Sequence, residues 1–323
     1  MNHDSPGRSR PDTPPPGETH TKCRTADGLE LHCRAWIPEH PRAALVIVHG
    51  LAEHGGRYRE TAGFFAAHGF AVTAGDLRGH GLSPDSPGGG RVHVQRFEDY
   101  LQDAAGFIAA ARRAAPGQAL YLLGHSMGGL ITLSYLLRNP ADVDGAIVSS
   151  PALGTHPDFK PPWVLRLLVG LLSRVAPRAR FPSDLDTGAI SRDPEVVRAY
   201  TEDPLVSNKV SARWYVEIVK AMKRAHAEAP MLRRPLLLMQ SGSDRLVDPA
   251  ATERWSAAAP SDCIDFVRWP GFYHEMFNEP EKDKVRARAL AWLEARLGAP
   301  AGENAGPPGG PAPGSPRPAF DQS

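Results

Sequence analysis

Long apolar runs are missing from this sequence. No stretch approaches the roughly 18 to 20 apolar residues that a membrane-spanning helix needs. Residues 1–16 carry charges and prolines but no apolar run, so we expect no secretory signal there. A charge excess is missing too, because 37 Lys and Arg stand against 36 Asp and Glu, a formal net charge of +1. We therefore expect a soluble protein that contacts a membrane at most peripherally and does not bind nucleic acid.

Cysteine is also scarce. The three cysteines, Cys23, Cys33 and Cys263, include no Cys-x-x-Cys spacing and form no cluster with histidines that would hold zinc. Such usage is typical of proteins in a reducing compartment. It predicts a cytoplasmic protein with no metal site.

Proline is concentrated at the two ends of the chain. Of the 32 prolines, 12 lie in residues 1–20 and 298–323, where Gly, Ser and Glu replace the large apolar residues that a core requires. We expect both segments to be disordered tails. Residues 21–297 then form one globular unit, which is a normal length for an α/β enzyme with an inserted segment.

Within this unit, short apolar runs alternate with helical patterns. Asp27-Gly28 predicts a hairpin turn between two strands, residues 21–26 and 29–37. Six further runs are continuous and apolar, as strands covered on both faces should be: residues 44–48, 70–74, 120–123, 146–149, 236–240 and 264–269. The alternation predicts an α/β fold with a doubly wound, mostly parallel sheet. Residues 151 to about 234 show helical periodicity and no convincing strand, which indicates an inserted helical cap.

The motif with the clearest chemistry is Gly124-His125-Ser126-Met127-Gly128, a G-x-S-x-G pattern. It follows an apolar strand and opens a helical pattern, which is the strand-turn-helix setting of a nucleophilic serine. The serine backbone is strained there, its neighbours must be small, and the helix N-terminus faces developing negative charge. The alternative interpretation is an ordinary glycine turn with a capping serine.

A nucleophilic serine needs a base and an orienting carboxylate, and both follow Ser126 in the order serine, acid, histidine. Asp244 comes directly after the strand at 236–240, where the carboxyl end of a parallel strand opens into a site. Asp248 is the competing acid, although its position before a helix is also that of a cap. His274 is the only histidine after Asp244 and again follows a strand.

Stabilising the oxyanion of such a reaction requires two backbone N–H groups. Met127 would supply one, and Leu51, in the glycine-rich loop after the strand at 44–48, would supply the other. For His49 in this loop, a structural hydrogen bond is favoured over a metal-ligand role. Asp, His and Ser also occur together in residues 76–83, but they are too close in sequence to act as a triad. We interpret that segment as a structured loop.

At these motifs the sequence resembles the monoacylglycerol lipase and bacterial lysophospholipase group of the α/β-hydrolases. The similar segments span most of the globular unit: residues 49–58, 76–83, 124–129, 191–193, 203–205, 242–246 and 273–274. The resemblance implies an α/β-hydrolase fold with Ser126, Asp244 and His274 as catalytic triad, Leu51 and Met127 as oxyanion donors, and no cofactor. It also implies that Glu53 and Arg57 stand near the polar head of the substrate. A surface ion pair is the alternative for those two.

The resemblance predicts a serine ester hydrolase that acts on monoacylglycerol-like lipids and releases fatty acid and glycerol through an acyl-enzyme. One position departs from the animal enzymes, because Phe277 stands where they carry a second histidine. This departure keeps lysophospholipids, short glycerides and simple esters open as substrates. Acyl transfer by the same triad is a further alternative, whereas a non-catalytic binding module is disfavoured because no triad member is lost.

Residues 163–175 predict an unusually apolar cap helix. Its polar positions, Arg166, Gly170, Ser173 and Arg174, form one narrow stripe on a helical wheel. Such a helix can line an acyl tunnel on one side and touch a membrane or micelle on the other, with Lys160, Arg178 and Arg180 favouring anionic headgroups. The alternative is a helix that is simply buried in the cap.

Overall fold

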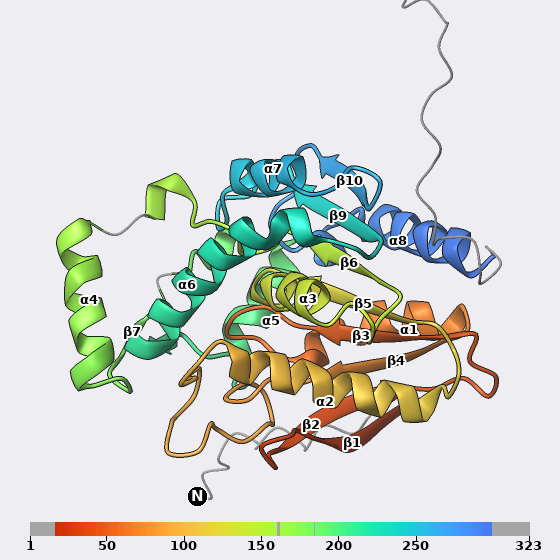
Figure 1. Ribbon diagram of the computed structural model, residues 1–323, viewed down its shortest axis with the longest axis horizontal. Coiled ribbons are helices and arrows are strands. Elements are labelled where there is room, and N and C mark those ends of the chain that lie inside the picture. The colour runs from red at the N-terminus through yellow and green to blue at the C-terminus, as the bar shows by residue number, and fades with distance from the viewer. Residues whose placement is uncertain (1–16, 160–161, 184, 299–323) are drawn as a thin grey trace, which may run out of the picture.

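The computed structural model describes residues 17–159, 162–183 and 185–298. Its centre is an eight-stranded sheet with the strand order β1-β2-β4-β3-β5-β6-β9-β10 (Figure 1). Neighbours from β4 to β10 pair in parallel, and β2 pairs antiparallel with both β1 and β4. The six predicted parallel strands are therefore confirmed. The strands are β1 (Glu18–Arg24), β2 (Glu30–Trp36), β3 (Ala43–Val48), β4 (Phe70–Gly75), β5 (Leu120–His125), β6 (Gly145–Ser149), β9 (Leu236–Ser241) and β10 (Ile264–Trp269).

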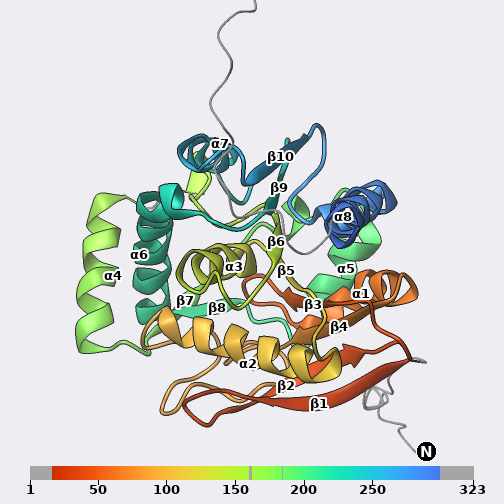
Figure 2. The same ribbon diagram turned by 45° about the vertical axis from the view of Figure 1, so that its right-hand side comes forward.

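Helices cover both faces of this sheet. Successive side chains of a strand point to opposite sides, so a strand that is apolar throughout has to be covered on both. In β3, Val46 packs into the core formed with α2, α3 and α7, whereas Ile47 packs into the core formed with α1 and α8 (Figure 2). The predicted doubly wound α/β architecture is thus confirmed. These helices are α1 (Arg59–Ala67), α2 (Glu98–Ala114), α3 (Met127–Arg138), α7 (Pro249–Ala258) and α8 (Lys282–Leu297). Short 3-10 helices lie at Gly55–Tyr58, Pro157–Phe159, Thr187–Ala189, Ala229–Met231 and Met276–Asn278.

The folded unit begins earlier than residue 21. Strand β1 starts at Glu18, and the carboxylate of Glu18 is buried between the guanidinium groups of Arg34 at 3.6 Å and Arg59 at 2.9 Å. The expected tail boundary at residue 20 is therefore wrong by three residues, because an isolated acidic residue shows no sign of burial until its partners are in place. The remaining tail residues, 1–16 and 299–323, lie outside the described chain.

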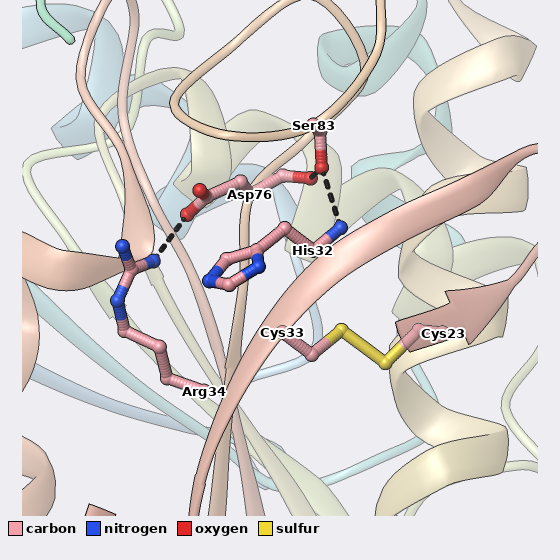
Figure 3. Close-up of a disulfide and its surroundings, with 6 residues drawn as sticks. All are labelled: Cys23, His32, Cys33, Arg34, Asp76 and Ser83. Atoms are coloured by element: carbon pink, nitrogen blue, oxygen red, sulfur yellow. Dashed lines mark hydrogen bonds and ion pairs between the residues drawn. A yellow bond between two sulfur atoms is a disulfide. The ribbon is translucent and has the colours of Figure 1, made fainter. Parts of the chain in front are cut away.

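The hairpin at the sheet edge carries a disulfide bond between Cys23 of β1 and Cys33 of β2 (Figure 3). This pairing differs from the expectation of reduced thiols. In the hairpin register Cys33 lies opposite Thr21, two residues from Cys23, so the two sulfurs bridge diagonal positions of the ladder. Both cysteines are fully buried, and Cys263 is the free cysteine.

The segment 76–83 is a structured loop, as expected, and it is hydrogen-bonded to strand β2. Arg34 donates to Asp76 at 2.9 Å, and the backbone N–H of His32 donates to Ser83 at 2.8 Å (Figure 3). The carboxylate of Asp76 also accepts from the N–H groups of Gly55 and Leu82, both at 2.8 Å. Asp76 and Ser83 therefore hold loops together, and neither belongs to a catalytic arrangement.

The cap lies between β6 and β9 and contains α4 (Trp163–Val175), α5 (Pro194–Glu202) and α6 (Ala212–Glu228). Helix α4 runs beside α6 at the outer edge of the molecule (Figures 1 and 2). Contrary to expectation, the cap also holds a small antiparallel sheet of β7 (Arg180–Pro182) and β8 (Lys209–Ser211). Strands of three residues are too short to show a period of two. Within the described ranges, no helix has the length and apolar character to cross a membrane.

Candidate active site

Ser126 occupies a sharp turn between β5 and α3, with φ 53° and ψ −117°. This left-handed backbone conformation is strained for any residue except glycine. The flanking glycines leave no room for side chains: a Cβ at Gly124 would lie 2.5 Å from the carbonyl oxygen of Gly128, and one at Gly128 would lie 2.0 Å from that of Val48. The glycines of the motif are thus required by close backbone approach, and they hold Ser126 at the C-terminal edge of the sheet.

Asp244 and His274 meet above the same edge. Nδ1 of His274 lies 2.8 Å from Oδ2 of Asp244, and the other carboxylate oxygen accepts from the backbone N–H groups of Leu246 at 2.9 Å and Val247 at 3.0 Å. Asp248 instead caps α7 through the N–H of Ala250 and pairs with Arg254. The structure therefore brings Asp244, and not Asp248, to the histidine.

The electrostatics of this pair suit a base. Burial works to raise the pKa of Asp244, but the charge and hydrogen bond of His274 outweigh burial and hold that pKa below its usual value. For His274, burial works to lower the pKa, and the charge and hydrogen bond of Asp244 raise it above its ordinary value. Asp244 is thus a carboxylate near neutral pH, and its contact orients the ring with Nδ1 inward, leaving Nε2 for the site.

A second histidine, His125, stands beside this pair. Its ring centre lies 4.6 Å from that of His274. Burial, and next the charge of His274, lower the pKa of His125 to about 4, so its imidazole is neutral at pH 7. It therefore adds no positive charge beside the base.

The oxyanion candidates Leu51 and Met127 border Ser126. His49 Nδ1 lies 2.8 Å from the carbonyl oxygen of Gly50, and its Nε2 accepts from the N–H of Leu77 at 3.0 Å. This contact confirms the structural hydrogen bond expected for His49 and fixes the Gly50–Leu51 peptide, whose N–H points away from the carbonyl. Among the described residues, neither the N–H of Leu51 nor that of Met127 has a hydrogen-bond partner. Both donors are thus available to a developing anion.

Glu53 and Arg57 do pair, but in the interior. Glu53 accepts from the N–H of Gly50 at 2.6 Å and from the hydroxyl of Tyr58 at 2.8 Å, and Arg57 donates to it at 2.5 Å. Arg57 also makes two hydrogen bonds to Glu275, at 2.6 and 2.8 Å. The alternative of a surface ion pair is therefore wrong, because the two residues belong to a largely buried network that Glu275 completes.

Glu275 was not identified from the sequence. Burial works to raise its pKa, but the charge and hydrogen bonds of Arg57 prevail and lower the pKa to about 2. The aromatic ring of Tyr200 on α5 covers the guanidinium of Arg57, with its centre 4.6 Å away. The only sign in the sequence was an acidic residue directly after His274. Its role cannot be inferred unless it is known that Arg57 lies beside it.

Two hollows adjoin Ser126 and His274. The larger is a cavity of about 910 Å³, and its wall is mostly apolar side chains of α4 and α6, among them Leu165, Leu172 and Ile218. The smaller is a recess of about 20 Å³ lined by Glu53, His125, Tyr200 and Glu275, together with Leu185, Ile190 and Leu246. Arg57 is not among the residues that line either hollow. In the described part of the chain, no cluster of His, Cys, Asp or Glu is arranged to hold a metal ion.

Helix α4 forms the outer wall of the cavity and leaves its other side uncovered. Val169 and Ser173 are buried toward α6, whereas Trp163 and Leu167 are 66% and 64% exposed. The polar stripe on the helical wheel is therefore divided: Ser173 faces the cap, Arg166 lines the cavity and Arg174 is exposed. Of the basic residues expected to favour anionic headgroups, Arg178 and Arg180 are exposed. Lys160 lies outside the described residues.

Comparisons with known proteins agree with this architecture. The model of the family described as "Serine aminopeptidase, S33" matches residues 39–281. A monoacylglycerol lipase of Mycolicibacterium smegmatis is 35% identical over 272 residues, covering 84% of this chain and 95% of the relative. Phospholipase YtpA of Bacillus subtilis is 35% identical over 262 residues, 80% of this chain and 98% of the relative. The crystal structure of a monoacylglycerol lipase from Paleococcus ferrophilus has a TM-score of 0.74 and 31% identity, and the match covers 83% of this chain and 99% of that one.

Proposed function

The chain belongs to the serine aminopeptidase S33 family of α/β-hydrolases, and we propose that it is a serine ester hydrolase that cleaves monoacylglycerol into fatty acid and glycerol. The observation that carries this proposal is the His274–Asp244 hydrogen bond beside a strained Ser126 at the mouth of an apolar cavity. Two relatives, at 35% and 31% identity, are named monoacylglycerol lipases, which favours ester over peptide substrates.

In the proposed mechanism, Nε2 of His274 takes the proton of Ser126 as the serine oxygen attacks the ester carbonyl. The N–H groups of Leu51 and Met127 stabilise the tetrahedral oxyanion. The imidazolium then gives its proton to the departing glycerol oxygen, which leaves an acyl-enzyme. Water activated by His274 hydrolyses this ester and frees the fatty acid. Asp244 orients the ring and stabilises its charged form throughout.

The two hollows suggest how the substrate lies. The apolar cavity of about 910 Å³ suits an acyl chain, because burying each CH₂ group contributes about 0.8 kcal/mol. The recess with Glu53 and Glu275 has room for about one hydroxyl group of the alcohol, which can donate to a carboxylate. We propose that Glu53 contacts the glycerol head and that Arg57 acts through the two carboxylates it holds.

A second candidate function is lysophospholipid hydrolysis, favoured by the similarity to phospholipase YtpA. It uses the same triad and the same acyl cavity, so only the headgroup distinguishes it. Acyl transfer to an added alcohol would likewise use the same acyl-enzyme, and product analysis with acceptor alcohols detects it.

We further propose that the cap rests on a lipid surface. The uncovered side of α4 presents Trp163, Val164 and Leu167, all at least 47% exposed. Exposed Arg174, Arg178 and Arg180 lie close by in the chain and would attract anionic lipid. A lipid source at this surface would be next to the helix that lines the acyl cavity.

The test compares Ser126→Ala with Ser134→Ala, which changes a buried serine of α3 that lines neither hollow. Release of fatty acid from 1-lauroylglycerol should fall by about 10⁶-fold in kcat for the first variant and stay near that of the unmodified protein for the second. A fluorophosphonate probe should label the protein and Ser134→Ala but not Ser126→Ala. Labelling without hydrolysis of any monoacylglycerol would reject the proposed substrate.

A further inference from the structure

The recess beside Ser126 has an unusual charge balance. Two carboxylates line it, Glu53 from the loop after β3 and Glu275 directly after His274. Both are almost fully buried, at 2% and 5% exposed. Buried carboxylates interact strongly with a charged group in the site, because the low-dielectric interior screens their charge less than water does.

Arg57 neutralises only one of these two charges. One terminal nitrogen of its guanidinium donates to both Glu53 and Glu275, and the other donates to Glu275. The ring of Tyr200 covers the guanidinium. Both terminal nitrogens are therefore engaged with protein carboxylates, and the group of three residues carries one net negative charge.

No other cation compensates at the recess itself. Among the described residues that line the two hollows, Arg166 is the only Arg or Lys, and it lines the cavity rather than the recess. His125 is neutral because burial lowers its pKa to about 4. The rest of the wall is Ser126 and His274 of the triad, the neutral hydroxyl donor Tyr200, and Gly50, Leu51, Leu185, Ile190 and Leu246, whose side chains carry no charge.

We propose that Glu53 and Glu275 make the alcohol side of the site selective for uncharged alcohols and exclude alcohols that carry a phosphate. A glycerol hydroxyl can donate a hydrogen bond to a carboxylate, whereas an ionised phosphate offers acceptors and meets like charge. The inference rests on the proposed function, since it assumes that the ester's alcohol faces the recess. It identifies Glu275 as a specificity-determining residue.

The experiment uses matched esters that differ in the headgroup alone. 1-Hexanoylglycerol and 1-hexanoylglycerol 3-phosphate share the acyl chain and the scissile bond, and both are used below their critical micelle concentrations so that no interface contributes. Hexanoylcholine adds a cationic alcohol. For the unmodified protein we expect kcat/KM on the glycerol ester to exceed that on the phosphate ester by on the order of 100-fold. The choline ester should not suffer this penalty.

The variant Glu275→Gln removes one charge while keeping an oxygen that accepts from Arg57. We expect it to reduce the ratio of the two kcat/KM values about tenfold, through a gain on the phosphate ester. Any change in the basicity of His274 affects both esters and cancels in the ratio. Glu279→Gln is the matched control, because Glu279 is buried on the same segment, binds Arg192 and lines neither hollow. Its ratio should stay within about twofold of the original, as expected for a residue outside the field of the recess.

Two results would overturn the inference. One is equal hydrolysis of the glycerol and phosphate esters by the unmodified protein, which needs no variant and would favour the lysophospholipase candidate. The other is an unchanged ratio in folded Glu275→Gln, or an equal shift in Glu279→Gln. Failure to cleave either hexanoylglycerol ester, with Ser126 still labelled by a fluorophosphonate, would reject the proposed function itself.

Discussion

Replacing Leu167 by aspartate tests whether the uncovered side of α4 binds lipid. Leu167 is 64% exposed and lines neither hollow, so its side chain has little to lose within the protein. Burying a leucine fully contributes roughly 1.5 to 3 kcal/mol, and the exposed share of Leu167 corresponds to about 1 to 2 kcal/mol. Losing that contribution weakens vesicle binding by about 5- to 30-fold, and the charge of aspartate adds to the loss.

Two control variants make this measurement specific. Ile37→Asp changes a comparably exposed residue, 50%, at the end of the β2 strand far from the cap in sequence, and it should leave vesicle binding unchanged. Leu172→Asp changes a residue that lines the acyl cavity, and it should lower hydrolysis of long-chain substrates even in detergent-free solution. Binding is measured by co-sedimentation with vesicles of phosphatidylcholine, with and without phosphatidylglycerol.

Hydrolysis of the soluble substrate hexanoylglycerol distinguishes a role of Leu167 in lipid binding from a role in stabilising the fold. If α4 docks on lipid, Leu167→Asp hydrolyses this ester at the original rate and loses activity on monoacylglycerol in vesicles. If Leu167→Asp instead lowers the melting temperature and both activities together, the residue supports the fold. Unchanged vesicle binding in this variant would also refute docking through this side of the helix.

Three further predictions concern the triad and the disulfide. Asp244 raises the pKa of His274 above its ordinary 6.5, so kcat/KM for a soluble ester should fall as the pH drops through a value above 6.5. Asp244→Asn should move this acidic limb of the pH profile to lower pH. If the limb does not move, it does not report the titration of His274. Asp244→Asn should lower kcat by about 10⁴-fold while Asp248→Asn changes it little, and the reverse would transfer the acid role to Asp248. Replacing both Cys23 and Cys33 by alanine should reduce the free energy of unfolding by about 2 to 3 kcal/mol in urea titrations, because the bond closes a loop with a sequence separation of 10; equal stability would show that the bond does not form in solution.

Much of this molecule follows from local pattern. The central strands could be predicted because a parallel strand covered on both faces is apolar throughout, as in Ala43–Val48 and Leu236–Ser241. The position of Ser126 could be predicted because the G-x-S-x-G turn between strand and helix demands glycines on both sides of the serine. Asp244 could be favoured over Asp248 because it directly follows a strand whose carboxyl end meets the site. Each of these inferences needs only residues that are neighbours in the chain.

The features that escaped prediction depend on distant partners. The carboxylate of Glu275 is stable in the interior because Arg57, 218 residues away in the chain, binds it with two hydrogen bonds. The same is true of Glu18 with Arg59. The partners of the disulfide are close in the chain, but its formation depends on the exact register of the β1–β2 hairpin. A charged residue in a sequence reads as exposed unless its partner is known, so the charge of a buried site is the property that sequence conveys least. For an esterase of this family, that charge is what would separate a neutral headgroup from a phosphorylated one. The acyl chemistry can therefore be inferred from a motif, whereas the choice of alcohol has to be inferred from the three-dimensional arrangement around Glu53, Arg57 and Glu275.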